Sequence, residues 1–450
     1  MISIRGMKIS ILALSMVAGM QFAHMQPAQA QLLVPKKENG ANGQKKALTL
    51  RDCKASYAGR DYRTAMNCFA RLAQQGSAEA QYQMGQMMFN GRGTTKNIYG
   101  AYPWFEKAAK QGHMKSQAFL GYMHANGVGA KKDEKRAVIY YTKAAKQGDA
   151  AAQNNLGNML RAGRGWKADK QAAAKWYLQA ATQNFAQAQV NLANMYIEGD
   201  GIKKNVEEAI KWYSQAALYG NSDAQRSLGV IYENGLGGIP KDIPKARGWY
   251  EKAAAQGNLE AIFSLAVFYE KGLVKDKYYS DAALLYNQAA LRGHMRSRYR
   301  LAQLFEQGRG VEKDLKKARD FYRLGVNAHH LPSKRAYALM VLKNFKDSPQ
   351  DLFMAKKLLK DLANFGEGIA QFELAKLYVA EDENGYSRLN EAYFWFSLAV
   401  ESLPDGEEKQ EAIVARTAIQ SELDATQIDH VKKQLALWKP YDMPERMILE

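Results

Sequence analysis

Apolar residues in segment 113–148 fall into two stripes, each with the spacing of one buried helix face. The first stripe covers about residues 115–125, and the second begins near Glu134. Residues three or four apart lie on one side of a helix, so each stripe predicts an amphipathic helix. Between them, Gly127 and Gly129 allow the first helix to end and the chain to reverse, because glycine enters left-handed conformations without a side-chain clash. The pattern predicts an antiparallel helical hairpin.

The same two-stripe pattern returns about every 36 residues through most of the chain. Leucine or methionine precedes the turn, and an aromatic residue follows it, at positions that repeat in phase. The glycines that end the first stripe are Gly91, Gly127, Gly163, Gly199, Gly235, Gly272 and Gly308. A fixed period of this length predicts a solenoid, in which neighbouring hairpins stack and build one continuous core.

Small residues recur where the two helices of a hairpin should approach each other. The first helix carries Gly85, Gly121, Gly157, Ala193, Gly229, Ala266 and Ala302 at one such position. Close approach of two helix axes requires missing side-chain volume, so we expect a larger residue at Gly157 or Ala209 to overpack its hairpin. A second column holds Trp104, Trp176, Trp212 and Trp249. Its spacing is locked to that of the neighbouring aromatic residue, which favours core between repeats over a ligand cage.

The repeated motif resembles the Sel-one-like repeat (SLR) family, a relative of the tetratricopeptide repeats. It reads A-x-x-x-LG-x-x-Y-x-x-G-x-G followed by A-x-x-W-Y-x-x-AA-x-x-G, and residues 188–220 match it closely. The resemblance covers about residues 49–400. It implies an all-α fold, a right-handed superhelical solenoid of antiparallel helix hairpins. It also implies a scaffold or adaptor for other proteins, and bacterial members of the family are often exported.

The degree of regularity predicts the organisation of the chain, because the ends of a solenoid need atypical capping units. We expect a signal peptide (1–30), a flexible basic leader (31–48), an N-terminal capping hairpin (49–76), seven regular repeats (77–328), a degenerate repeat (329–366), a last repeat (367–403) and C-terminal capping helices with a tail (404–450).

The first thirty residues have the layout of a secretory signal peptide. Arg5 and Lys8 precede an apolar stretch over about residues 9–23, and small residues flank Gln29 ahead of an expected cleavage site near Ala30. The alternative, an uncleaved anchor, requires roughly 20 apolar residues, and this stretch is shorter. We therefore expect a periplasmic or secreted protein with no transmembrane segment after cleavage.

The chain has two cysteines, Cys53 and Cys68, placed symmetrically about the expected turn at Gly59. In an oxidising compartment this pair predicts a disulfide that fastens the N-terminal cap, with two buried thiols as the alternative. Cysteine-rich relatives in the SLR family carry such a pair in every repeat. This chain has a single pair, so the beta-lactam binding of that branch does not transfer.

The formal net charge is +18, and it is unevenly distributed. Residues 113–148 carry +5 and residues 294–366 carry +9, whereas residues 367–450 carry −9. Such asymmetry can indicate a site for an anionic partner or a head-to-tail self-attraction, but solvated helix faces that keep a long solenoid soluble are the favoured explanation. Export argues against a nucleic-acid partner.

The sequence offers little that indicates catalysis. The seven histidines show no metal-ligand spacing, and we interpret His113, His124, His294 and the pair at 329–330 as surface or turn residues. Acidic residues gather at expected helix starts, where the helix dipole accounts for them. We expect no enzyme, no catalytic residue, no cofactor and no metal.

We therefore expect a protein-interaction scaffold that binds a protein partner in a concave groove lined by the first helices of the repeats. The candidate groove residues, predicted to be exposed, are Gln117, Asn154, Asn155, Asn191, Gln225, Arg226 and Arg298. An alternative is an envelope factor that holds peptidoglycan or another anionic polymer on the basic segments 113–148 and 294–366. A beta-lactam-binding or hydrolase-like protein is the third and least favoured hypothesis.

Overall fold

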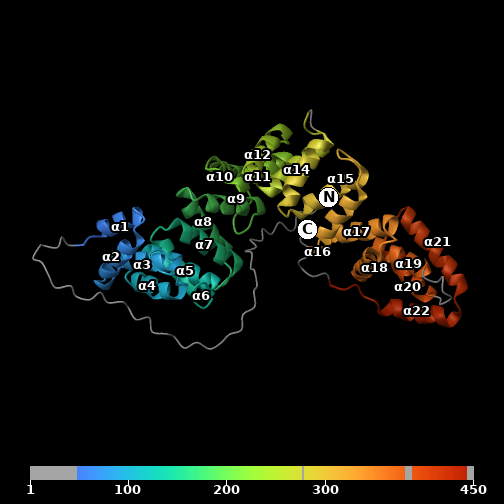
Figure 1. The fold of residues 1–450 in the computed structure, drawn as a ribbon. Coiled ribbons are helices and arrows are strands. Elements are labelled where there is room, and N and C mark those ends of the chain that lie inside the picture. Colours follow the sequence, from blue (N-terminus) through green and yellow to red (C-terminus); the bar gives the residue numbers. More distant parts are fainter. Residues whose placement is uncertain (1–47, 276–277, 381–387, 443–450) are drawn as a thin grey trace, which may run out of the picture. The chain divides into compact units, whose positions relative to one another are not determined.

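The computed structural model describes residues 48–275, 278–380 and 388–442, and in these ranges the secondary structure is helical throughout. The described residues form two compact units, one ending at Trp249 and the other beginning at Tyr250. Within each unit, consecutive helices pack on one another along the chain (Figure 1). The all-α solenoid predicted from the repeat period is thus confirmed. The predicted signal peptide and leader, apart from residue 48, lie outside the described residues.

The unit that ends at Trp249 consists of successive helix pairs. Its helices are α1 (Leu50–Ala58), α2 (Tyr62–Gln74), α3 (Ala78–Asn90), α4 (Ile98–Lys110), α5 (Met114–Asn126), α6 (Glu134–Lys146), α7 (Ala150–Ala162), α8 (Lys170–Thr182), α9 (Ala186–Glu198), α10 (Val206–Leu218), α11 (Ser222–Asn234), the short 3₁₀-helix η1 (Leu236–Gly238) and the first part of α12 (Ile243–Ala255). We call the odd-numbered helices α1 to α19 the A helices and the even-numbered helices α2 to α20 the B helices.

The unit that begins at Tyr250 continues this alternation. Its helices after α12 are α13 (Leu259–Glu270), α14 (Tyr279–Leu291), α15 (Met295–Gln307), α16 (Leu315–Asn327), α17 (Leu331–Asn344), α18 (Pro349–Asn364), α19 (Gly368–Ala380), α20 (Leu389–Ser402), α21 (Glu407–Glu422) and α22 (Ala425–Leu437). Both terminal helices, α21 and α22, pack on α20 and close this end of the core.

Local sequence signals set the start and end of each helix, as α7 illustrates. The Asp149 carboxylate accepts a hydrogen bond from the backbone N–H of Ala152 at 2.7 Å, which caps the first turn. At the other end, Gly163 adopts the left-handed conformation, with φ 67° and ψ 27°. A side chain there is strained, so the recurring glycine ends the A helix as predicted.

The small residues of the A helices lie under the aromatic rings of the B helices. A Cβ atom added at Gly157 would stand 2.7 Å from Cε1 of Tyr177, and one at Gly121 would stand 2.6 Å from Cδ1 of Tyr141. Such separations are below van der Waals contact. The predicted close approach of the two helices is therefore confirmed.

The second glycine of each loop has a role that reaches beyond the turn. A Cβ atom at Gly165 would overlap the backbone carbonyl of Glu134, which begins the B helix of the preceding repeat. Gly201 stands in the same relation to Lys170, the first residue of α8. Each loop thus rests directly on its predecessor and helps to stack the repeats.

The tryptophan column lies between repeats, as predicted. Trp176 and Trp212 are partly buried and pack against the core that contains Tyr177 and Leu192, and Trp212 also packs against the core of the next repeat. Because one indole ring contributes to two successive cores, this column is structural.

Two further expectations concern the atypical units. Cys53 and Cys68 form a disulfide between α1 and α2, with their Sγ atoms 2.07 Å apart.

Segment 329–366, predicted as a degenerate repeat, forms a complete hairpin of α17 and α18. A short loop of residues 345–348 replaces the glycine loop, and the apolar face with Leu358 and Leu359 remains fully buried. The repeat is thus degenerate in its loop and not in its packing.

Candidate functional site

A column of glutamines on the A helices joins each repeat to its predecessor. In each case the side-chain Nε2 donates a hydrogen bond of 3.0–3.2 Å to the carbonyl oxygen eight residues earlier, in the last turn of the preceding B helix. The residues are Gln81, Gln117, Gln153, Gln189, Gln225 and Gln371. Each of these carbonyl oxygens also accepts the backbone N–H of a residue in the turn that follows, as Ala145 does from Gly148, so the glutamine amide adds a second donor.

Three of the residues predicted to line an exposed groove are buried in the structure. Gln117, Asn154 and Gln225 were expected to be exposed, yet their exposed fractions are 5%, 4% and 6%. The two glutamines point back into the seam between repeats, and the Asn154 side chain bonds to asparagines beside it. Polarity at a helical position misled the sequence interpretation, because the seam itself contains polar bonds.

The other candidate groove residues are partly exposed, and they differ in their contacts. Arg298 takes the place of a column glutamine, since its Nε donates to the carbonyl oxygen of Ala290 at 2.9 Å. Asn155, Asn191 and Arg226 are half-buried on α7, α9 and α11. The structure therefore brings Asn155 and Asn191 together with the buried Asn154 but gives Arg298 a structural contact.

Asparagine side chains connect α7 and α9 across two repeats. The Nδ2 of Asn191 donates to Oδ1 of Asn154 at 2.8 Å and to Oδ1 of Asn158 at 3.2 Å. Asn191 and Asn194 stand one repeat after Asn155 and Asn158. We call Asn155, Asn158, Asn191 and Asn194 together the amide face.

Two tyrosines of the B helices orient this face. The Tyr177 hydroxyl donates to Oδ1 of Asn158 at 2.7 Å, and the Tyr213 hydroxyl donates to Oδ1 of Asn194. Burial raises the pKa of Tyr177, and it raises the pKa of Tyr213 to about 12, so both hydroxyls keep their protons at neutral pH. The tyrosine hydroxyls thus hold the Oδ1 atoms of Asn158 and Asn194. The Nδ2 atoms of these two asparagines have no acceptor among the described residues. The face thus presents amide donors to a ligand.

Two aromatic residues occupy, in the preceding repeat, the positions that correspond to the amide face, and we call them the aromatic patch. Phe119 and Tyr122 of α5 stand one repeat before Asn155 and Asn158. Their ring centroids are 5.8 Å apart, Phe119 packs on Phe89, and 41% of Tyr122 is exposed. Tyrosine with an apolar neighbour is a common anchor at protein interfaces.

Several arginines of the basic segments are engaged in ion pairs within the fold. Arg319 pairs with Asp351 at 3.0 Å, and Arg335 pairs with Glu367 at 2.7 Å. Arg296 lies 3.2 Å from a carboxylate oxygen of Glu260. Part of the positive charge of segment 294–366 is therefore neutralised locally and is not available to an anionic polymer.

Histidine serves as a helix cap in this protein. At His113, His294 and His330, Nδ1 accepts a hydrogen bond from the backbone N–H three residues later, at 3.2–3.3 Å. The signal is H-x-x-S, which the sequence interpretation overlooked. His124 and His330 are buried, with exposed fractions of 3%. His330 lies in the turn before α17, as predicted, whereas His124 lies inside α5, so its interpretation as a surface or turn residue was wrong.

His124 is held by two neighbours. Its Nε2 lies 3.2 Å from the Tyr102 hydroxyl, and its Nδ1 lies 3.3 Å from the carbonyl oxygen of Lys131.

Among the described residues, no cluster of three or more His, Cys, Asp or Glu side chains has the arrangement of a metal site. The same residues contain no helix of the length and apolar character that a membrane span requires.

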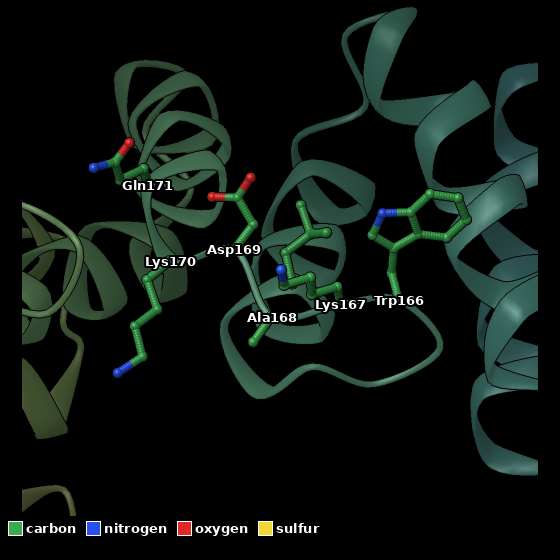
Figure 2. A pocket seen from close by; sticks show the side chains of 7 residues that line it. Trp166, Lys167, Ala168, Asp169, Lys170 and Gln171 are labelled. Atoms are coloured by element: carbon green, nitrogen blue, oxygen red, sulfur yellow. The ribbon is translucent and has the colours of Figure 1, made fainter.

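A shallow hollow of about 590 Å³ lies under the loop between α7 and α8 (Figure 2). The labelled side chains do not converge on a common point, and Trp166 and Lys170 point in different directions. Asp169 caps α8, while Lys170 pairs with Asp200 at 2.6 Å. Asp169 and Lys170 of this hollow therefore have structural partners.

The Sel1 repeat matches nine segments of the chain, at residues 56–77, 78–113, 115–149, 150–185, 186–221, 222–258, 259–294, 296–330 and 368–402. The chain belongs to the Sel1 repeat family. Solenoids of this family are typically protein-interaction scaffolds. Among curated protein sequences, none matches this chain.

Two solved structures illustrate how far the likeness to Sel1 repeat proteins extends. A protective antigen of uropathogenic Escherichia coli strains, which displays an SLR fold, is 27% identical and has a TM-score of 0.64. The likeness covers 86% of this chain and 84% of the antigen. A Sel1 repeat protein from Oxalobacter formigenes is 31% identical over 54% of this chain and 96% of its own, with a TM-score of 0.49.

Proposed function

We propose that this Sel1 repeat protein is a non-catalytic scaffold of the bacterial cell envelope that binds an extended segment of a partner protein on the amide face. The observation that carries the proposal is that Tyr177 and Tyr213 hold the Oδ1 atoms of Asn158 and Asn194, while the Nδ2 atoms of these asparagines have no acceptor among the described residues. An extended peptide repeats carbonyl acceptors along its length, and a primary amide is a suitable donor for them. Side chains of the peptide would pack on the neighbouring Tyr122.

The envelope location rests on two further points. The first thirty residues have the features of a signal peptide, with an expected cleavage site near Ala30. The similar antigen of Escherichia coli is protective, and a protective antigen is one that the immune response of the host can recognise. Cell fractionation followed by N-terminal sequencing tests this location, and a mature protein that begins at Gln31 in the periplasm or medium is expected.

Photo-crosslinking in the cell tests the binding surface. We place a photoreactive residue at Gln187, which is exposed on α9 and donates to Oδ1 of Asn191, and a matched control at the exposed Leu178 on α8. A crosslinked partner protein is expected at Gln187 and not at Leu178. Replacing Asn158 and Asn194 together with alanine should reduce the crosslink. Equal crosslinking at both positions, or none at Gln187, would contradict the proposal.

Ionic strength separates this function from polymer binding. Exposed charges are screened within roughly 10 Å at 0.1 M salt, so a complex with peptidoglycan or another anionic polymer should weaken steeply as salt is added. A complex that depends on amide hydrogen bonds and an aromatic anchor should weaken much less. Co-sedimentation with purified peptidoglycan, at low and at physiological salt, measures the difference.

A further inference from the structure

A second surface lies in the unit that begins at Tyr250, where α18 packs against α19. A groove of about 330 Å³ opens between these helices, which lie next to each other in Figure 1. Its apolar floor includes Phe353 of α18 together with Leu377 and Tyr378 of α19. The α17–α18 hairpin falls in the interval between two Sel1 repeat matches, so the wall of the groove that α18 provides lies outside the repeat motif, whereas the wall that α19 provides lies in the last repeat.

Phe353 is the most exposed apolar residue of α18. Leu358 and Leu359 of the same helix are in the core, whereas 72% of Phe353 is exposed on the opposite face. It lies beside other apolar side chains of the groove, Leu377 and Tyr378. An exposed ring within an apolar hollow is typical of a binding site and is unfavourable in water.

Cations form the rim of this groove. Lys356, Lys357 and Lys360 continue the stripe of Phe353 along α18 at helical spacing, and Arg388 stands at the start of α20. In the described part of the chain, no acidic side chain lines the groove, and neither Lys357 nor Lys360 forms an ion pair.

These lysines differ from the arginines of the neighbouring hairpin. Arg319 and Arg335 each pair with an acid of the fold, whereas Lys357 and Lys360 keep their charges for a ligand. The guanidinium of Arg388 lies 5.3 Å from the centroid of the Tyr378 ring, which joins the charged rim to the apolar floor. A matching ligand therefore carries negative charges around an apolar group.

We propose that the groove between α18 and α19 binds an acidic segment of a partner protein. An aromatic or aliphatic side chain of the segment is seated against Phe353 and Tyr378, and its flanking carboxylates face Lys357 and Lys360. This site is independent of the amide face. The amide face binds a peptide backbone and selects little by sequence, whereas this groove selects acidic residues around an apolar anchor.

The test uses the full-length protein and a fluorescein-labelled peptide of the sequence Glu-Asp-Phe-Glu-Asp-Leu-Glu, followed by fluorescence anisotropy. A second peptide has serine in place of phenylalanine and leucine, and a third has lysine in place of every acid. We expect saturable binding of the first peptide alone. Substitution of Phe353→Ser or Lys357→Glu should each weaken it by about tenfold or more, because each removes one of the two recognised features.

Lys432→Glu is the matched control, since Lys432 is exposed on α22 of the same unit and the charge change is identical. It should leave binding within about twofold of the unsubstituted protein. Thermal unfolding of each variant verifies the fold, and the Asn158→Ala, Asn194→Ala double variant should bind the peptide normally. That last result separates failure of this site from failure of the amide face.

Three outcomes would overturn the proposal. The first is no binding of the acidic apolar peptide, and the second is equal binding of the serine peptide, which would indicate charge alone. The third is binding to phosphatidylglycerol vesicles that Lys357→Glu abolishes while peptide binding is unchanged, because the groove would then serve an anionic membrane surface.

Discussion

The side-chain amide of Gln153 donates a hydrogen bond to the carbonyl oxygen of Ala145, 3.0 Å away, and thereby joins two repeats. Gln153 lies on α7, and Ala145 lies in the last turn of α6, the B helix of the preceding hairpin. Both residues are buried. The Ala145 carbonyl oxygen also accepts from the backbone N–H of Gly148, so the glutamine adds a second bond, and a typical intramolecular hydrogen bond contributes about 0.5–1.5 kcal/mol to stability.

Gln153→Met should lower the free energy of unfolding by about 1–2 kcal/mol, because methionine fills a similar volume but cannot donate. Urea unfolding monitored by circular dichroism measures the effect. Gln171→Met, at an exposed position on α8, is the control and should change stability by less than about 0.5 kcal/mol. Equal effects at the two positions would argue against a structural role for the column.

Gly157→Ala should destabilise its hairpin by about 1–3 kcal/mol, since the added methyl group would lie 2.7 Å from the Tyr177 ring. The control is Gly248→Ala in α12, where a Cβ atom would have no heavy atom within 4 Å. Alanine is the better helix former, so this second variant should be neutral or stabilising by up to about 1 kcal/mol. The two thermal midpoints should therefore move in opposite directions, and a parallel shift would refute the packing argument.

Removal of the Cys53–Cys68 disulfide should loosen the N-terminal cap without loosening distant repeats. The cysteines are 15 residues apart, and a loop of this size corresponds to about 3 kcal/mol in the chain-entropy estimate. In a repeat protein each hairpin depends mainly on its neighbours, so the loss stays local. Hydrogen exchange of the double alanine variant should show faster exchange in α1 and α2 and unchanged exchange in α9. Uniform acceleration in all helices would contradict local stabilisation.

Acid should destabilise the protein partly through His330. Burial, with a smaller contribution from Arg296, lowers the pKa of His330 to about 4, whereas a histidine in the unfolded chain has a pKa of about 6.5. Between these values the unfolded state binds the additional proton, so the free energy of unfolding falls as the pH drops from about 6.5 to about 4.

The variant His330→Asn keeps a side-chain acceptor for the cap but does not titrate. Relative to this variant, the unsubstituted protein should lose on the order of 2 kcal/mol of stability between pH 7 and pH 4. Chemical unfolding at several pH values provides the measurement. Parallel pH profiles for the two proteins would show that His330 is not responsible.

The sequence was sufficient for the features that depend on local periodicity. Helix ends at Gly163, the close contact of Gly157 with Tyr177 and the position of Trp212 between repeats all follow from helical spacing and residue size. These signals are repeated many times, so a single atypical copy does not hide them. The disulfide also follows from the symmetry of Cys53 and Cys68 about one turn.

The sequence failed where a polar residue has two possible environments. Gln117 and Asn155 both suit an exposed helix face, and only the packing of the preceding hairpin shows that Gln117 points into the seam. The sequence places His330 in a turn but does not show that the side chain is buried there, because its burial depends on the packing of other helices around it. The groove at Phe353 was missed because it depends on contacts between helices and not on the repeat.

The loop glycines and the glutamine column set the same relation at the five junctions from α2–α3 to α10–α11. Gly165 rests on the start of the preceding B helix, and Gln153 reaches the end of that same helix. Loss of one whole repeat from this stretch therefore brings together two hairpins that already carry both halves of the contact. Genetic recombination within this stretch can shorten or lengthen the chain by single units without creating an unmatched junction.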